Sequence, residues 1–182
     1  MRSKLGLIIS LSLVGVLVIT AIILGVVKVD YSPKFFDAPN SIMITDKDSS
    51  AQYHTGRTSE GEQKENFVKL VSLYNGIYKQ SVIASTFAGN AGNEVVVQYE
   101  SGSVPSKSGY RVLINYPTKA VKASNGIEYQ VEQLIFNLED KAGMQEVTLY
   151  LNIKGSTTGY LTVKTLANTK MLYDFVSELE YK

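Results

Sequence analysis

Residues 5–27 form an uncharged apolar run, and this run constrains the fold more than any other feature of the chain. Sixteen of its 23 residues are Leu, Ile or Val. About 20 apolar residues are enough to cross a hydrocarbon core of roughly 30 Å. Insertion of these aliphatic side chains is favourable by about 5 to 10 kcal/mol. The run therefore predicts a transmembrane helix, and only the residues after it have to fold in water.

A cleaved signal peptide is the alternative interpretation of this run. Arg2 and Lys4 would form its basic region, but the apolar part of a signal peptide has about 7 to 15 residues and ends at a small-x-small cleavage site. The present run is longer, and residues 26–29 read Val-Val-Lys-Val, which offers no such site. We therefore expect an uncleaved signal-anchor over residues 1–28.

Positive charges on the two sides of the run are nearly balanced. Arg2 and Lys4 precede it, and Lys28 and Lys34 follow it. Both early charges lie in a tail of four residues, and long downstream domains are translocated largely regardless of their charge. We expect a single-pass protein of the cell membrane, with a cytoplasmic N-terminus and an extracytoplasmic C-terminal domain.

Small residues recur along one face of the expected membrane helix. They form two small-xxx-small pairs, Gly6 with Ser10 and Ala21 with Gly25. Such stripes let helices approach closely, which favours a homodimer through this face. Chance is the competing explanation, because seven of the 23 residues are Gly, Ala, Ser or Thr.

The composition of the residues after the anchor limits the classes of partner that this protein is expected to bind. From residue 29 onwards, 15 Lys and Arg residues stand against 17 Asp and Glu residues, a net charge of −2. Nucleic acid is therefore not an expected partner, because its binding needs a basic surface. The chain has no cysteine, and so it can form neither disulfides nor thiolate ligands. The sequence also lacks Asn-x-Ser/Thr glycosylation sites. Together these features favour a bacterial surface.

The segment 29–40 is expected to be an extended juxtamembrane stalk. It contains Pro33 and Pro39, and proline lacks a backbone donor and disfavours helix just before it. The remaining residues, 41–182, have the length of one ordinary domain that can bury a core.

One amphipathic helix is expected near the start of this domain, over about residues 60–79. Ser59 and Glu62 have the spacing of a capping box. Apolar residues then recur at helical spacing and predict a single buried stripe. The stripe consists of Phe67, Leu70, Val71, Tyr74, Ile77 and Tyr78.

The period of the apolar residues elsewhere is two, which predicts strands. The expected strands are 41–45, 82–87, 94–100, 110–116, 127–138, 145–154 and 160–166. Residues 46–59 are polar and are expected to form a loop. Pro117 is expected to interrupt the strands, with a further short strand after it that leads to Asn125-Gly126. This dipeptide predicts a type I′ hairpin turn. Asn168 is expected to cap a second, C-terminal helix.

Short turns between strands imply antiparallel pairing. The sequence thus predicts an α+β fold: an N-terminal transmembrane helix, then a curved, mostly antiparallel β-sheet with one helix before and one after the strand meander. This order of elements is similar to helix-grip domains of the START type and to cystatin-like sheets wrapped on a helix. The likeness implies a fold only, because fold does not determine function.

His54 is the single histidine of the chain. We expect it in an exposed loop without a catalytic role. With one histidine and no cysteine, the sequence predicts no metal site and no cofactor.

Asp46, Asp48 and Ser50 are spaced like the first ligands of a calcium loop. However, Ala51 stands where that loop needs glycine, and Arg57 stands where it needs a bidentate glutamate. We interpret Asp46 and Asp48 as parts of a solvated turn.

Residues 101–105 read Ser-Gly-Ser-Val-Pro, and Gly109 and a strand follow them. This pattern loosely resembles the serine box of type I signal peptidases, which are membrane-anchored and rich in β structure. The resemblance implies that Ser103 would be a nucleophile, with Lys119 or Lys122 as its base, provided that burial lowers the lysine pKa. The competing interpretation is a hairpin loop of Ser, Gly and Pro.

The chain has 12 tyrosines and no tryptophan. Several of these tyrosines fall on expected strands, and we select Tyr129 and Tyr150 as candidate binding residues. Tyrosine combines an apolar ring with a polar tip, which suits a sheet face that meets a partner. High strand propensity is the alternative reason for their abundance.

Taken together, the sequence favours a membrane-anchored binding, sensing or accessory module without catalytic activity. Its expected partner is a protein or small molecule outside the membrane. The alternative is a membrane-tethered serine hydrolase or peptidase that uses Ser103.

The anchor makes a direct prediction. Because no cleavage site follows the apolar run, the mature protein purified from membranes should keep its first residues. The intact mass of that protein tests this expectation. A mature chain that begins near Val29 would contradict the anchor and support a signal peptide.

Overall fold

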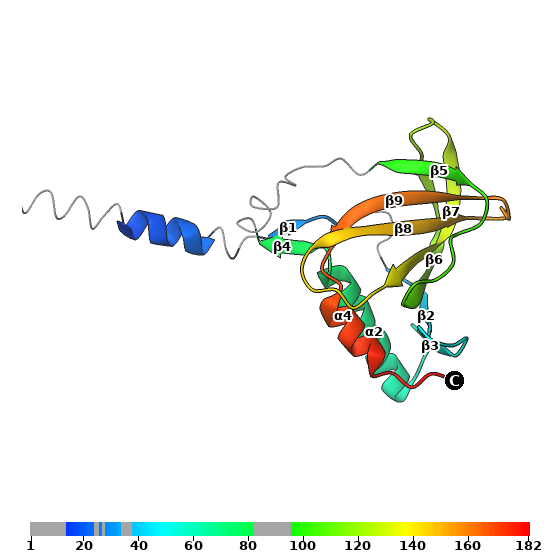
Figure 1. The fold of residues 1–182 in the computed structure, drawn as a ribbon, viewed down its shortest axis with the longest axis horizontal. Helices are drawn as coiled ribbons and strands as arrows, with labels where there is room; N and C mark the ends of the chain where they lie inside the picture. Colours follow the sequence, from blue (N-terminus) through cyan, green and yellow to red (C-terminus); the bar gives the residue numbers. More distant parts are fainter. Residues whose placement is uncertain (1–13, 24–25, 27, 34–37, 82–95) are drawn as a thin grey trace, which may run out of the picture. The chain divides into compact units, whose positions relative to one another are not determined.

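The computed structural model describes residues 14–23, 26, 28–33, 38–81 and 96–182, and Figure 1 shows the fold. The described chain is α+β and contains a seven-stranded antiparallel sheet. The chain divides into two compact units, one of residues 1–30 and 79–93 and the other of residues 31–78 and 94–182.

In the first unit, residues 14–23 are helical and include the exposed Ala21. Strand β1 (Lys28–Asp30) pairs antiparallel with β4 (Lys79–Ser81). Among the described residues, none of the helices is both long and apolar enough for a membrane span. Most of the predicted dimer stripe, Gly6, Ser10 and Gly25, and the strand predicted over 82–87 lie outside the described residues.

In the second unit the sheet has the strand order β3-β2-β6-β7-β8-β9-β5 (Figure 1). Every neighbouring pair is antiparallel, as the short turns predicted. The strands are β2 (Ser41–Thr45), β3 (Gln52–Gly56), β5 (Val97–Ser101), β6 (Tyr110–Lys122), β7 (Glu128–Leu138), β8 (Gln145–Ile153) and β9 (Gly159–Ala167).

Two helices, α2 (Gly61–Gly76) and α4 (Lys170–Ser177), pack on one face of this sheet. Their buried side chains belong to the same core as the inward-facing strand residues. Phe67 is 7% exposed, which confirms the predicted core face of the first helix. In the strand expected over 145–154, alternation predicts one buried face through Leu149, and Leu149 is fully buried in β8. The predicted stripe is confirmed as well. Its buried members are Phe67, Leu70, Tyr74, Ile77 and Tyr78.

The predicted capping box was wrong. Helix α2 begins after Glu60 without a side-chain cap. Ser59 instead closes a tight turn with Gly56. Ser59 Oγ accepts the Gly56 N–H at 3.0 Å, and the Ser59 N–H donates to the Gly56 carbonyl. At helix α4 the N-cap position is Thr169, but Asn168 Oδ1 accepts the N–H of Lys170, the first residue of the helix, at 3.3 Å. Asn168 therefore does satisfy a backbone donor at the start of α4, as predicted.

The loop prediction for 46–59 was wrong in part, because Gln52–Gly56 forms β3. Tyr53 and Thr55 are buried and alternate with the exposed His54. The alternation was missed because only one of these inward positions carries a large apolar side chain. Pairing with β2 supplies the remaining stabilisation.

A hairpin forms at Asn125-Gly126, but the predicted turn type was wrong. Gly126 has φ +81°, and none of the described residues other than glycine has a positive φ. A type I′ turn needs positive φ at both central residues. Here the Gly126 N–H donates to the Ala123 carbonyl at 2.9 Å, and only the glycine adopts the left-handed conformation.

Pro117 does not separate two strands as predicted, because β6 continues through it to Lys122. The register of β6 against β7 shifts between Asn115 and Lys119, and a bulge accommodates a residue without a backbone donor. Beyond the bulge the hairpin reaches β5. Ser124 N–H donates to the Val97 carbonyl at 2.8 Å, which joins the β6–β7 hairpin to β5 at this end.

The segment 102–109, which we name the strap, connects β5 at one edge of the sheet to β6 near its other edge (Figure 1). The strap crosses the face that lacks helices. Ile135, which points to that face, is only 5% exposed, and it lines a cavity together with Ser103 and Val104. The guanidinium of Arg111, also on that face, donates to the Pro105 carbonyl.

The strap ends at Gly109, and this position predicts a large loss of stability on substitution. Gly109 has φ +68°, and an added Cβ would lie 2.3 Å from the Leu138 carbonyl oxygen. Gly155 has φ +73° with open space around it, so Gly155→Ala should cost only the strain of the left-handed backbone, roughly 1–2 kcal/mol. Gly109→Ala should exceed that cost by about 1–3 kcal/mol because of the clash.

Urea titrations of the two variants and the unchanged protein measure these free energies of unfolding. Equal losses for Gly109→Ala and Gly155→Ala would show that the strap does not enter β6 as described.

Candidate functional site

A row of polar side chains crosses the helix-free face of the sheet. The register places Ser41 of β2 beside Asn115 of β6, then Gln133 of β7, Asn152 of β8 and Tyr160 of β9. Each residue lies on a different strand, and neighbouring strands are about 4.8 Å apart. The row therefore runs perpendicular to the strands.

The three amides of this row form one directional chain of hydrogen bonds. Asn152 Nδ2 donates to Gln133 Oε1 at 3.0 Å, and Gln133 Nε2 donates to Asn115 Oδ1 at 2.9 Å. Asn115 Nδ2 then donates to Ser41 Oγ at 2.9 Å. The chain fixes the orientation of all three amides, so their remaining polar groups are held in place.

Each amide keeps hydrogen-bonding capacity beyond the row. A carboxamide has two N–H donors and an oxygen with two lone pairs. Within the row, Asn115 and Gln133 each use one donor and one lone pair, and Asn152 uses one donor. All three side chains are partly exposed. We define this amide row as Asn115, Gln133 and Asn152.

Two cavities flank the amide row and meet at Asn152 and Ser156. The first has a volume of about 450 Å³ and lies over Asn115, Gln133 and Asn152. The second, about 380 Å³, lies between the strap and the turn that joins β8 to β9, and it includes Tyr160. We call these two adjoining cavities together the amide groove.

The amide groove is nearly neutral. Among the residues that line its two cavities, Glu132 is the charged one. The Glu132 carboxylate lies 3.6 Å from the Lys154 ammonium. Lys154 Nζ also donates to Thr118 Oγ1 at 3.2 Å. The groove therefore presents neutral donors and acceptors, with its one carboxylate offset by a neighbouring cation.

Two tyrosine rings lie at the β8–β9 end of the row. Tyr150 and Tyr160 pack edge to face, with ring centroids 5.8 Å apart. Burial raises the pKa of the Tyr160 phenol, and the nearby Glu100 carboxylate raises it further. Tyr160 thus stays neutral and can both donate and accept a hydrogen bond.

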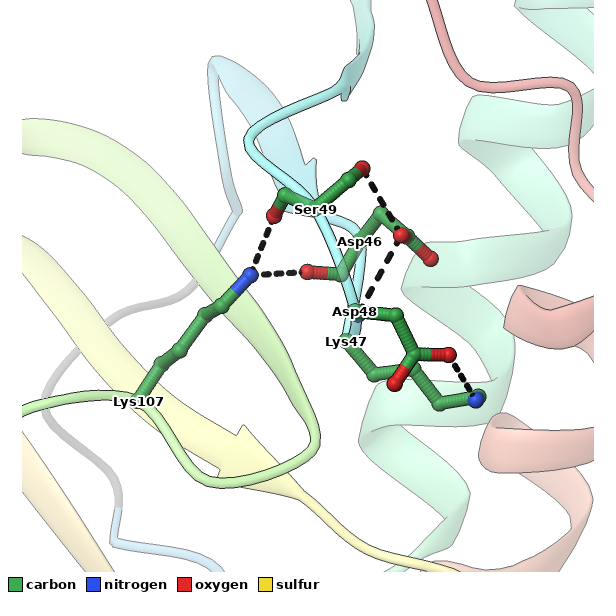
Figure 2. A network of polar contacts seen from close by, with 5 residues as sticks. All are labelled: Asp46, Lys47, Asp48, Ser49 and Lys107. Atoms are coloured by element: carbon green, nitrogen blue, oxygen red, sulfur yellow. Dashed lines mark hydrogen bonds and ion pairs between the residues drawn. The ribbon is translucent and has the colours of Figure 1, made fainter.

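The strap that walls the groove is fastened to the turn between β2 and β3 (Figure 2). Lys107 Nζ donates to the backbone carbonyls of Asp46 and Ser49. The Asp46 carboxylate accepts from Ser49 Oγ at 2.8 Å and from the Asp48 N–H at 3.2 Å. The Ser49 hydrogen bond in particular lowers the pKa of Asp46. Asp46 and Asp48 therefore belong to a turn that holds the strap.

From the sequence, the carboxylates of this turn are also possible metal ligands, because Asp46 and Asp48 have the spacing of a calcium loop. Within the described ranges, no group of three or more His, Asp or Glu side chains is placed to hold a metal ion.

Ser103 and the two candidate lysines lie in different places. Ser103 is exposed and lines the second cavity, between the strap and β9. Lys119 and Lys122 lie on β6 beyond the bulge, opposite Val131 and Glu128 of β7. Neither lysine lines the cavity that contains Ser103.

His54 is exposed on β3, and its Nε2 lies 3.0 Å from Gln52 Oε1. It lines a larger open cavity of about 740 Å³ between β3, α2 and the C-terminal residues. This cavity lies apart from the amide groove and shares no lining residue with it.

The two candidate tyrosines lie on opposite faces of the sheet. Tyr129 packs against the hydrophobic core and stacks on Tyr99, with ring centroids 5.3 Å apart. Tyr150 pairs in register with Ile135 and lies on the helix-free face. The pair therefore does not form one surface, and Tyr160 is the ring that accompanies Tyr150.

Sequence reasoning missed the amide row. Asn115, Gln133 and Asn152 occupy outward positions of three expected strands, so their exposure could be predicted. Their alignment depends on the register shifts in β6 and β7, between Asn115 and Lys119 and between Val131 and Gln133. The available signal was an amide at an outward position on each of three successive strands.

Comparisons of the chain with protein-family models, with curated proteins and with solved structures found no match.

Proposed function

We propose that this protein is a membrane-anchored, extracytoplasmic binding module that recognises its ligand with the amide groove. The apolar run 5–27 would hold the chain in the membrane, and residues 41–182 would lie outside, because long downstream domains are translocated largely regardless of their charge. The tether would then keep the groove close to the cell surface.

The observation that carries this proposal is the spare hydrogen-bonding capacity of the amide row. Both α2 and α4 pack on the opposite face, so they leave the row open to a partner. The amides are oriented by their mutual hydrogen bonds before any ligand arrives. Preorganised polar groups reduce the entropy cost of binding, which favours recognition.

Tyr160 lines the second cavity and adds an aromatic ring and a hydroxyl group at one end of the groove. Tyr150 packs edge to face against it. Tyrosine is enriched in binding surfaces because its ring buries a large area and its hydroxyl group stays hydrogen-bonded. A groove lined by neutral amides, hydroxyl groups and a tyrosine ring is suited to binding a ligand through hydrogen bonds and ring contacts.

Photocrosslinking in intact cells tests the proposal. A photoreactive amino acid replaces Thr157, which is exposed and lines the groove, in the full chain. The matched position is Val68 on α2, which is 59% exposed on the opposite side of the sheet. We expect a covalent adduct from position 157 and little from position 68.

Two further variants separate recognition from chance proximity. Asn152→Ala should reduce the adduct from position 157 several-fold, whereas Asn75→Ala, on the exposed surface of α2, should not. Equal adducts from positions 157 and 68 would contradict the proposal.

The serine hydrolase alternative has its own test. An activated serine reacts with a fluorophosphonate probe, and our proposal predicts no labelling of the protein. Labelling that Ser103→Ala abolishes, in a protein that still folds, would replace the binding proposal with a hydrolase.

A further inference from the structure

We infer that the ligand of the amide groove is an uncharged glycan chain that lies across the strands. This inference rests on the proposed function and adds the chemical class of the ligand. Charge, spacing and hydrogen-bonding chemistry each support it.

The charge of the groove excludes strongly ionic ligands. Glu132 is the charged residue among those that line the two cavities, and it lies 3.6 Å from the ammonium group of Lys154. An anionic polymer would need several lysines or arginines along the row, and a cationic one would need several carboxylates. A neutral ligand needs no charged residues along the row.

The spacing of the row favours a glycan over a peptide. The amides lie on adjacent strands, roughly 4.8 Å apart. An extended peptide advances about 3.3 Å per residue and presents side chains on alternate sides, so its repeat does not match this spacing. The ring-to-ring repeat of an extended glycan is close to the strand separation.

A peptide would also lack its usual means of binding to a sheet. Strand addition needs an unpaired edge. The amide row lies on β6, β7 and β8, and each of these strands is paired on both sides. The three strands beneath the row therefore offer the ligand their side-chain groups, and these have to be met by polar groups spread along the ligand.

Sugar hydroxyls can form hydrogen bonds with the N–H donors and oxygen lone pairs that the amide row does not use internally. A hydroxyl donates one hydrogen bond and accepts up to two, and a carboxamide with one free N–H and one free lone pair can pair with two neighbouring hydroxyls. The carbonyl oxygen of Asn152, which accepts nothing within the row, marks the end nearest to Tyr160. There Tyr160, which lines the second cavity, offers its hydroxyl group to the ligand.

Binding of a β-linked N-acetylglucosamine hexasaccharide to the full chain in detergent micelles tests the inference. This probe is uncharged and carries both hydroxyls and amides. A fluorescently labelled probe gives the dissociation constant by fluorescence polarisation. We expect saturable binding that is weakened about tenfold by Gln133→Leu, because this change breaks the middle of the row.

The matched control is Gln130→Leu, which changes the same residue type on the same strand at an exposed position outside both cavities. It should leave the dissociation constant unchanged. Thermal unfolding of both variants checks that they remain folded.

Three outcomes would overturn the inference: no saturable binding of the uncharged probe, equal or tighter binding of a polyuronate of similar length, or equal binding of a neutral Gly-Ser peptide. If the photocrosslink from position 157 forms in cells while the glycan does not bind, the ligand class is wrong and the binding function stands. If neither occurs, both are wrong.

Discussion

The pairing of β5 with β9 is the constraint on which the rest of the second unit depends. It places β5 at one edge of the sheet, while β6, the next strand in the sequence, lies beyond β7, β8 and β9. Residues 102–109 therefore have to cross a face of the sheet. Helices α2 and α4 occupy one face, so the strap takes the other, where it buries Ile135 and forms one wall of the amide groove. Lys107 fastens it to the β2–β3 turn.

The bulges in β6 and β7 set what that groove contains. Because a shift of one residue moves a side chain to the opposite face of a sheet, the positions of these bulges decide which residues share a row. The observed register brings Asn115, Gln133 and Asn152 to one level, and their hydrogen bonds then orient all three amides. The same bulges bring the tip of the β6–β7 hairpin to β5, where Tyr129 stacks on Tyr99. The bulges in β6 and β7 thus contribute both to the contact between the hairpin and β5 and to the alignment of the amide row.

Local patterns predicted most of the elements and little of the site. Helical spacing from Phe67 to Tyr78 and alternation through Leu149 correctly identified buried faces, since burial follows directly from periodicity. Strand β3 was missed because its polar side chains hide the alternation. The same patterns gave Asn115, Gln133 and Asn152 outward positions, but their alignment depends on two bulges and on a crossing strap. Those depend on contacts far apart in the sequence, such as Lys107 with the Asp46 carbonyl and Arg111 with the Asn137 side chain.

The central claim is that the oriented amides of this row contact the ligand, and side-chain amide resonances report on it most directly. In a ¹H–¹⁵N NMR titration of the full chain with the N-acetylglucosamine hexasaccharide, the NH₂ signals of Asn115, Gln133 and Asn152 should shift and saturate together. The NH₂ signals of Asn66 and Asn75 on α2 should stay in place. Unchanged signals from the amide row at saturating ligand, with shifts elsewhere on the domain, would contradict the account.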